Sequence, residues 1–217
     1  MAAWAMLTAG AVLLHRAARG TPRAESIRIW VGCIGVLASA ATVVWYLWPA
    51  HFHWGRSLPL ELCDLASMAA PIAVLTRKRF YRAVLHFWGL ALCTQAFVSP
   101  VHEPGTARFV LMWLLHGSIV GLAIFDAAAL GFRPAWRDLR AACLAATVYV
   151  LTVFVLDAST GFNYGYVGPS APGVPTIVDA LGPWPLRVVW ICCIGGGAMV
   201  LVMLLWQVAR RVGGGGR

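Results

Sequence analysis

Residues 58–76 read LPLELCDLASMAAPIAVLT, an apolar segment with a thiol and two carboxyl groups near its start. A helix that crosses a membrane needs about 20 mostly apolar residues, and this segment is close to that length. Ionisable side chains at membrane depth are costly, which makes each of them a candidate for function. Cys63, between Glu61 and Asp64, is therefore the first candidate that the sequence offers.

The composition of the whole chain is that of a membrane protein. The chain is 60% hydrophobic and 12% charged, with a mean hydropathy of +0.76, whereas soluble domains are about 45 to 50% apolar and about 25% charged. We predict an all-α, polytopic membrane protein with one transmembrane domain over residues 1–212. The glycine-rich tail, residues 213–217, is predicted to be disordered. Seven apolar segments supply the bundle: 1–14, 27–48, 58–76, 80–98, 107–130, 139–156 and 184–208.

Basic residues alternate strictly between the two sides of this seven-segment arrangement. Of the 17 Lys and Arg residues, all but three follow segment one, three, five or seven; the exceptions are Arg56, Arg108 and Arg187. The positive-inside rule then predicts an outside N-terminus, a cytoplasmic C-terminus and a multi-pass protein of the cell membrane. We expect the basic side to contact anionic lipid headgroups. Nucleic acid is not an expected partner, because no basic patch is interleaved with exposed aromatic residues.

Several kinds of site are disfavoured by the sequence. All six cysteines fall in apolar segments, which argues against a disulfide framework. The only lysine, Lys78, follows segment three, so a buried Schiff-base lysine is missing. The motifs of zinc proteases, serine hydrolases and nucleotide-binding loops are absent. His51 and His53, with His102 and Glu103, give only weak evidence for a metal site. We expect no metal and no cofactor.

Polar residues converge on the predicted outer half of the bundle. Cys63 lies near the outer end of segment three, His116 in the outer half of segment five and Gln95 near the exit of segment four. Glu61, Cys63, Asp64 and Ser67 share one helix face. The outer loops add Asn163, Tyr164 and Asp179. We therefore predict a polar site between segments three, four and five, covered by the loop over residues 158–183.

Each of these residues also has a structural interpretation. A buried cysteine often packs as a small hydrophobic side chain. Glu61 and Asp64 can serve as helix caps, with Pro59 in the first turn of the helix. His116 can be a neutral hydrogen-bonding residue between helices.

The order of motifs resembles the YwaF-like integral membrane protein family, which includes the eukaryotic transmembrane protein 164. The resemblance rests on Leu58 to Asp64, Phe87-Trp88-Gly89-Leu90, Gln95-Ala96, Pro100, Leu115-His116-Gly117, Asn163-Tyr164, Asp179 and Leu181-Gly182-Pro183-Trp184-Pro185. It implies a seven-helix bundle and, from the eukaryotic members, an acyltransferase that remodels ether phospholipids with a conserved cysteine and histidine. These fall on Cys63 and His116. One departure follows Asn163-Tyr164, where a Lys-Pro is expected and Gly168-Pro169-Ser170 stands instead.

The leading functional hypothesis is therefore acyl transfer, or acyl hydrolysis, on membrane phospholipids. His116 would take the proton of Cys63, and the thiolate would attack an acyl ester. Glu61, Asp64, Gln95, Asn163, Tyr164 and Asp179 are the expected substrate-binding or supporting residues, with Asn163 or Gln95 stabilising the oxyanion. The alternative hypothesis is a non-enzymatic protein that senses lipid, or binds or transports a small solute, through the same polar cavity.

Overall fold

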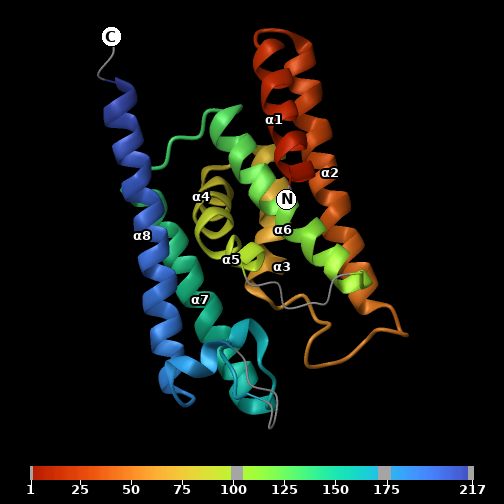
Figure 1. The fold of residues 1–217 in the computed structure, drawn as a ribbon, viewed down its shortest axis with the longest axis vertical. Coiled ribbons are helices and arrows are strands. Elements are labelled where there is room, and N and C mark those ends of the chain that lie inside the picture. The colour runs from red at the N-terminus through yellow and green to blue at the C-terminus, as the bar shows by residue number, and fades with distance from the viewer. Residues whose placement is uncertain (1, 99–104, 171–176, 215–217) are drawn as a thin grey trace.

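The computed structural model describes residues 2–98, 105–170 and 177–214, which form an α-helical bundle (Figure 1). The described residues contain one helix of nine or more residues for each predicted segment: α1 (Ala2–Ala17), α2 (Pro22–Leu47), α3 (Leu62–Thr76), α4 (Arg79–Phe87), α6 (Ala107–Ala128), α7 (Trp136–Thr160) and α8 (Leu186–Gly214). Four of them, α2, α6, α7 and α8, are long and apolar enough to cross a membrane. The all-α prediction is confirmed.

Helix α3 lies at the centre of the bundle and packs against α2, α4 and α6. Helices α1 and α2 lie on one side of it and α7 and α8 on the other (Figure 1). The inward face of α3 is built from small side chains, namely Ala66, Ala69, Ala70 and Ala73, all of which are buried. Small side chains let neighbouring helices approach closely, which is the usual basis of packing between membrane helices.

Helix α1 packs closely against two glycines of α6. A Cβ atom at Gly117 would collide with the ring of Trp4, and one at Gly121 would collide with the hydroxyl of Thr8. The two glycines are four residues apart and share one face of α6. This is the spacing of the small-residue motif found where membrane helices cross closely. Gly117, which follows the candidate base His116 in the sequence, is therefore in contact with α1.

The predicted single helix over residues 80–98 is wrong. Helix α4 passes into a π-helical turn, η1 (Trp88–Leu92), and the short helix α5 (Gln95–Val98) follows Cys93. The amide of Cys93 donates to the carbonyl of Trp88, at 2.9 Å, and the indole of Trp88 donates to Ala142 on α7, at 3.1 Å. The wider turn thus coincides with a tertiary hydrogen bond. Such π-turns often occur at functional sites.

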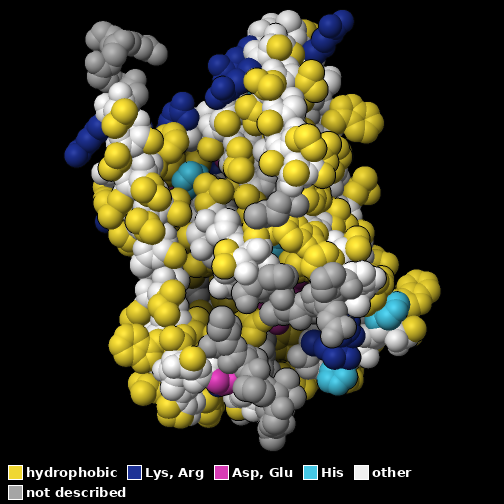
Figure 2. Space-filling model, viewed as in Figure 1, with side chains coloured by type: hydrophobic (Ala, Val, Ile, Leu, Met, Phe, Trp, Pro, Cys, Tyr) yellow, Lys and Arg dark blue, Asp and Glu magenta, His cyan; other side chains and the backbone are white. Residues whose placement is uncertain are grey.

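Arginines cover the C-terminal ends of helices at one end of the bundle. Arg28 of α2 donates to the carbonyls of Val74 and Leu75, both at 2.6 Å, and Arg16 of α1 donates to Ala128 at 3.0 Å. Cations at helix C-termini satisfy free carbonyls and interact favourably with the helix dipole. Figure 2 shows Lys and Arg side chains gathered at this upper end.

Ion pairs between helices strengthen the same end. Arg82 of α4 binds Asp126 of α6 at 2.9 Å, and Arg79 binds Asp138 of α7 at 2.6 Å. The α1–α2, α3–α4 and α6–α7 connections therefore meet at one end, as the charge pattern requires. Helix α8 includes Gly213 and Gly214, the first residues of the predicted disordered tail, and the remainder of that tail lies outside the described residues.

Candidate functional site

Cys63 is the second residue of α3, at the end of the bundle opposite the arginine-rich connections. Its side chain is half-buried. The titratable groups around the thiol are Asp64, Glu61 and Cys93, the last of these at the end of the π-helical turn. The thiol thus packs against the apolar core, with two carboxyl groups beside it, between α3 and the segment that follows α4.

Glu61 and Asp64 organise the start of α3. Glu61 is the residue that caps the helix, and its amide donates to Oδ2 of Asp64 at 3.1 Å. A carboxylate three residues into a helix that accepts from the capping residue is half of a capping box. The structural interpretation of Asp64 as a helix cap is therefore confirmed. The expected place of Pro59 in the first turn is wrong, because the helix begins only at Leu62.

The loop after α7 is joined to this helix start. The amide of Gly165 donates to Oε2 of Glu61 at 2.8 Å. Gly165 has a φ of 60°, and a Cβ atom there would collide with the hydroxyl of Tyr149. Only glycine meets both conditions without strain. The hydroxyl of Tyr164 donates to the carbonyl of Trp54 and accepts from the amide of Leu58 at 3.3 Å. The loop thus lies against the residues that lead into α3.

Four of the five tyrosines surround the Glu61, Cys63 and Asp64 group, a feature that we did not predict from the sequence. Tyr46 of α2 lies near Cys63 and Asp64, and Tyr149 of α7 donates to the carbonyl of Leu60 at 2.9 Å. Tyr164 and Tyr166 come from the loop after α7, and both lie near Glu61.

Burial raises the pKa of the two loop tyrosines, Tyr164 and Tyr166, and nearby carboxylates raise it further. Both hydroxyls therefore stay protonated at neutral pH and remain hydrogen-bond donors. The sequence held one signal for this group, since Tyr164 and Tyr166 stand two residues apart in the predicted outer loop.

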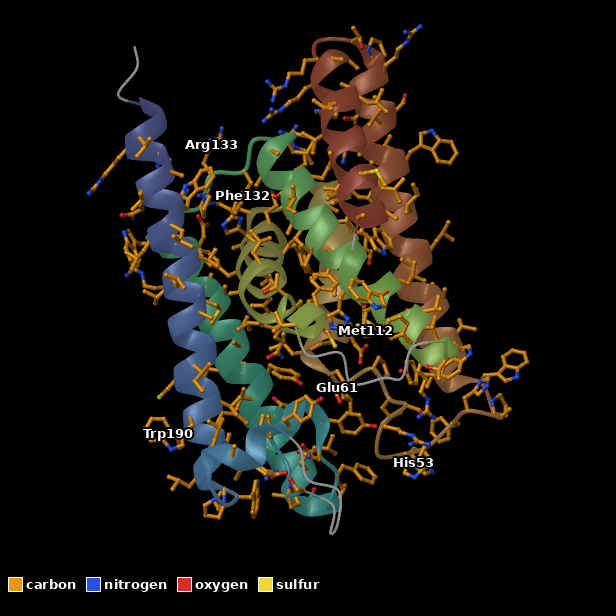
Figure 3. All side chains as sticks on the ribbon, viewed as in Figure 1. His53, Glu61, Met112, Phe132, Arg133 and Trp190 are labelled. Atoms are coloured by element: carbon orange, nitrogen blue, oxygen red, sulfur yellow. The ribbon has the colours of Figure 1, made fainter. Side chains whose placement is uncertain are left out.

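His116 is buried in α6, and its tautomer is fixed by a backbone contact. Nδ1 lies 2.9 Å from the carbonyl oxygen of Met112. A carbonyl only accepts, so Nδ1 is the donor and the neutral ring carries its lone pair on Nε2. The ring of Phe97 lies edge-on to the imidazole. Helix α6 packs against α3, the helix that carries Cys63. In Figure 3, Met112 and Glu61 lie in the lower half of the bundle, away from Phe132 and Arg133.

The remaining predicted residues lie in different surroundings. Gln95 begins α5 and is exposed. Asn163 has a buried Oδ1 that no described residue contacts by a hydrogen bond. Pro100, His102 and Glu103 are outside the described residues. Within the described ranges no group of three or more His, Cys, Asp or Glu side chains is arranged to hold a metal ion. All six cysteines are free thiols.

Asp179 marks a second polar centre in the loop before α8. It binds Arg187, and its Oδ1 accepts from Ser170 at 2.6 Å. Arg187 also donates to Ser170 at 2.8 Å and to the carbonyl of Gly168, and its side chain is almost wholly buried. A cation therefore reaches the stretch around Gly168 and Ser170, where the expected Lys-Pro is missing.

One buried acid was not predicted as part of the site. Asp157, near the end of α7, is wholly buried. The backbone amide of Tyr164 lies near its carboxyl group, but no described group completes a hydrogen bond of good geometry to either oxygen. It lies near Glu61 and Tyr164. Burial of a carboxyl group without partners is costly, and such groups often serve a function.

Comparison with known proteins gives one match. The model of the TMEM164 family matches residues 1–206. No curated protein and no solved structure matches the chain. The family match covers nearly the whole chain, including α3, α6 and the loop before α8, and agrees with the predicted resemblance to transmembrane protein 164. The chain belongs to the TMEM164 family.

Proposed function

We propose that the protein is a membrane-embedded acyltransferase, or acyl hydrolase, that acts on phospholipids through a thioester on Cys63 with His116 as base. The proposal places seven spans in the cell membrane, with the N-terminus outside, the C-terminus cytoplasmic and the site in the outer half of the bilayer. Membership of the TMEM164 family supports a membrane protein. The activity is inferred from the motif resemblance and from the chemistry of the site.

The orientation is supported by the position of the arginines. The connections that carry them meet at one end of the bundle, where Arg16, Arg28 and Arg79 bind helix ends and carboxylates. By the positive-inside rule this end faces the cytoplasm, where it would meet anionic headgroups. Cys63, in the first turn of α3, is then at the outer end.

The tautomer of His116 is the observation that carries the proposal. A general base needs a lone pair on a nitrogen, and the bond from Nδ1 to Met112 assigns that lone pair to Nε2 in the neutral ring. The base and the thiol are on two helices that pack together. Neither lipid contact nor core packing requires an imidazole at this depth.

The reaction would proceed in two steps. His116 Nε2 takes the proton of the Cys63 thiol, and the thiolate attacks the acyl carbonyl of a phospholipid. The carbon–oxygen ester bond then breaks, and the departing alkoxide of the lysolipid takes the proton from the imidazolium. In the second step, the hydroxyl of an acceptor lysolipid gives its proton to His116 and attacks the thioester. The thiolate leaves and is protonated again; water as acceptor gives hydrolysis.

The supporting residues have defined places in this scheme. Asp64 and Glu61 hold the start of α3 and the covering loop, so they position the thiol. Asn163 is half-buried in that loop, whereas Gln95 is exposed, so the Nδ2 amide of Asn163 is the better placed of the two predicted oxyanion donors. One such donor often contributes about 3 kcal/mol to the rate-limiting barrier.

The test is acyl exchange between a labelled phospholipid and a lysophospholipid, with purified protein in nanodiscs. Cys63→Ser and His116→Asn are expected to lose exchange, by about a thousandfold or more for the nucleophile. Cys33→Ser, which alters a thiol on α2, is the matched control and should keep it. Exchange retained by Cys63→Ser would exclude the thioester.

A second candidate is a non-enzymatic protein that binds a lipid or a small cationic solute. The observation that favours it is the grouping of Glu61, Asp64 and Asp157 at one end of the bundle, since buried carboxylates line many ion and proton pathways. Saturable solute binding that Asp157→Asn abolishes, in a protein without acyl exchange, would support this function.

A further inference from the structure

Two arginines stand apart from the other cations of the protein. Arg56, in the loop between α2 and α3, and Arg108, in the first turn of α6, lie at the predicted outer end with Arg187. Arg187 is buried and bound to Asp179. Within the described part of the chain, the side chains of Arg56 and Arg108 have no ion pair and no hydrogen bond.

The fold brings these two arginines to one place. Helices α2 and α6 pack together, with Gly35 of α2 against Leu122 of α6, and the end of α2 lies beside the start of α6 (Figure 1). Tyr46, in the last turn of α2, lies near both Arg108 and Arg56. Figure 2 shows basic and histidine side chains together at the lower right of the molecule. Two neighbouring guanidinium groups attract an anion.

The loop that carries Arg56 is fixed in position. His51 stacks on Trp45 of α2, with ring centroids 4.1 Å apart. The buried hydroxyl of Ser57 accepts from the amide of His53 at 2.8 Å, and the amide of Arg56 donates to the carbonyl of His53 at 3.1 Å. Trp54 is tied by its carbonyl to Tyr164. Arg56 is thus held on an ordered turn, which reduces the entropy lost when it binds a ligand.

Tyr46 links this pair to the thiol. It lies near Arg108 and Arg56 and also near Cys63 and Asp64. In a glycerophospholipid, the phosphate and the acyl ester carbonyls are separated by only a few bonds of the glycerol unit. A phosphate held at Arg56 and Arg108 would therefore leave an ester within reach of the Cys63 end of Tyr46. We propose that Arg56 and Arg108 together form the phosphate-binding subsite for the phospholipid, an assignment that rests on the proposed function.

The chemistry of the subsite is that of a phosphate ester. Guanidinium groups match phosphate oxygens with paired hydrogen bonds, better than a lysine does. The amide groups in the first turn of α6 add a favourable dipole for an anion. A phospholipid carries both a phosphate and an acyl ester. Inorganic phosphate is the other ligand that could bind the same two arginines.

The test compares dissociation constants, by calorimetry in an uncharged detergent, for four proteins: wild type, Arg56→Gln, Arg108→Gln and Arg140→Gln. The probes are a short-chain phosphatidylglycerol, the matching diacylglycerol without phosphate, and inorganic phosphate. Arg140, exposed on α7 at the opposite end, is the matched control. Each outer variant should weaken binding of the phosphatidylglycerol about tenfold, the usual effect of a lost charged hydrogen bond. The control should not change it.

The remaining probes and variants distinguish a phosphate-binding subsite from other causes of weaker lipid binding. Diacylglycerol binding should be the same in all four proteins. Arg56→Lys and Arg108→Lys should bind phosphatidylglycerol more tightly than the Gln variants but less tightly than the wild type, because lysine keeps the charge and loses the paired hydrogen bonds. Equal losses for the two lipids, or for the Arg140 variant, would overturn the assignment. Displacement of the lipid by inorganic phosphate at similar concentration would assign the subsite to free phosphate instead. Cys63→Ser should bind as the wild type does, so the subsite can stand even if acyl transfer fails.

Discussion

The backbone amide of Gly165 donates a hydrogen bond of 2.8 Å to the Oε2 atom of Glu61. It joins the loop between α7 and α8 to the residue that caps α3, and Cys63 follows two residues later. The covering loop and the candidate nucleophile therefore form one unit. A change that displaces the loop should also displace the thiol.

Gly165→Ala should destabilise the protein by about 1–3 kcal/mol. The residue has a φ of 60°, and its new methyl group would meet the hydroxyl of Tyr149. Gly131→Ala is the control, because Gly131 has a similar φ of 70° but open space around it. Gly131→Ala should cost only about 1 kcal/mol of stability, which is the cost of placing alanine at a positive φ. Unfolding in sodium dodecyl sulfate measures both, and equal losses would show that the contact with Tyr149 is unimportant.

Tyr164→Phe should cost about 1–3 kcal/mol of stability. The change removes the donor to Trp54 and the acceptor for Leu58, which leaves two partly buried backbone groups without these partners. Acyl exchange should fall as well, because the loop is released from the start of α3. Tyr81→Phe is the control, since the described residues provide no hydrogen-bond partner for the hydroxyl of Tyr81. If Tyr164→Phe leaves the stability unchanged, contacts other than the Tyr164 hydroxyl hold the loop in place.

Gly117→Ala should destabilise the packing of α1 on α6 by about 1–3 kcal/mol, because the added methyl group collides with the indole of Trp4. Gly10→Ala, within α1 and with no neighbouring atom near its Cβ position, should be neutral or stabilise the protein by up to about 1 kcal/mol. The comparison uses the same denaturation assay. A stabilising Gly117→Ala would contradict the close crossing of these helices.

Arg187→Met should be among the most damaging single changes around the start of α8. It leaves Asp179 and the carbonyl of Gly168 without their buried cation, at a cost of about 3 kcal/mol. Arg140→Met, at an exposed position, should stay within about 0.5 kcal/mol of the wild type. If both variants unfold alike, Arg187 does not organise the loop.

The positions of the helices followed from the sequence because lipid exposure and charge leave simple patterns. The segment over residues 107–130 became α6, Ala107–Ala128, and the alternating arginines gathered at one end. The π-helical turn at Trp88 left no such pattern, since it coincides with a hydrogen bond to Ala142 on a distant helix. A tertiary contact of this kind cannot be read from local periodicity.

The site was predictable only in part, for the same reason. Cys63 and His116 stand out as polar residues in apolar segments. The free energy needed to place such groups at membrane depth is enough to identify them. The four tyrosines come from α2, α7 and the loop after α7, and only the loop pair, Tyr164 and Tyr166, is adjacent enough in the sequence to be noticed together. Asp157 was not singled out, because an acid near the end of a predicted helix usually faces water. Arg187 was counted as an outer cation, and only the fold reveals its bond to Asp179.

Intact-protein mass spectrometry tests the central proposal most directly. Wild type, Cys63→Ser and the control Cys33→Ser are mixed with phospholipids, quenched in acid at a series of times and weighed before and after hydroxylamine. We predict an acyl adduct on wild type and on Cys33→Ser that hydroxylamine removes, and none on Cys63→Ser. No adduct on wild type at any time, or the same adduct on Cys63→Ser, would contradict a thioester at Cys63.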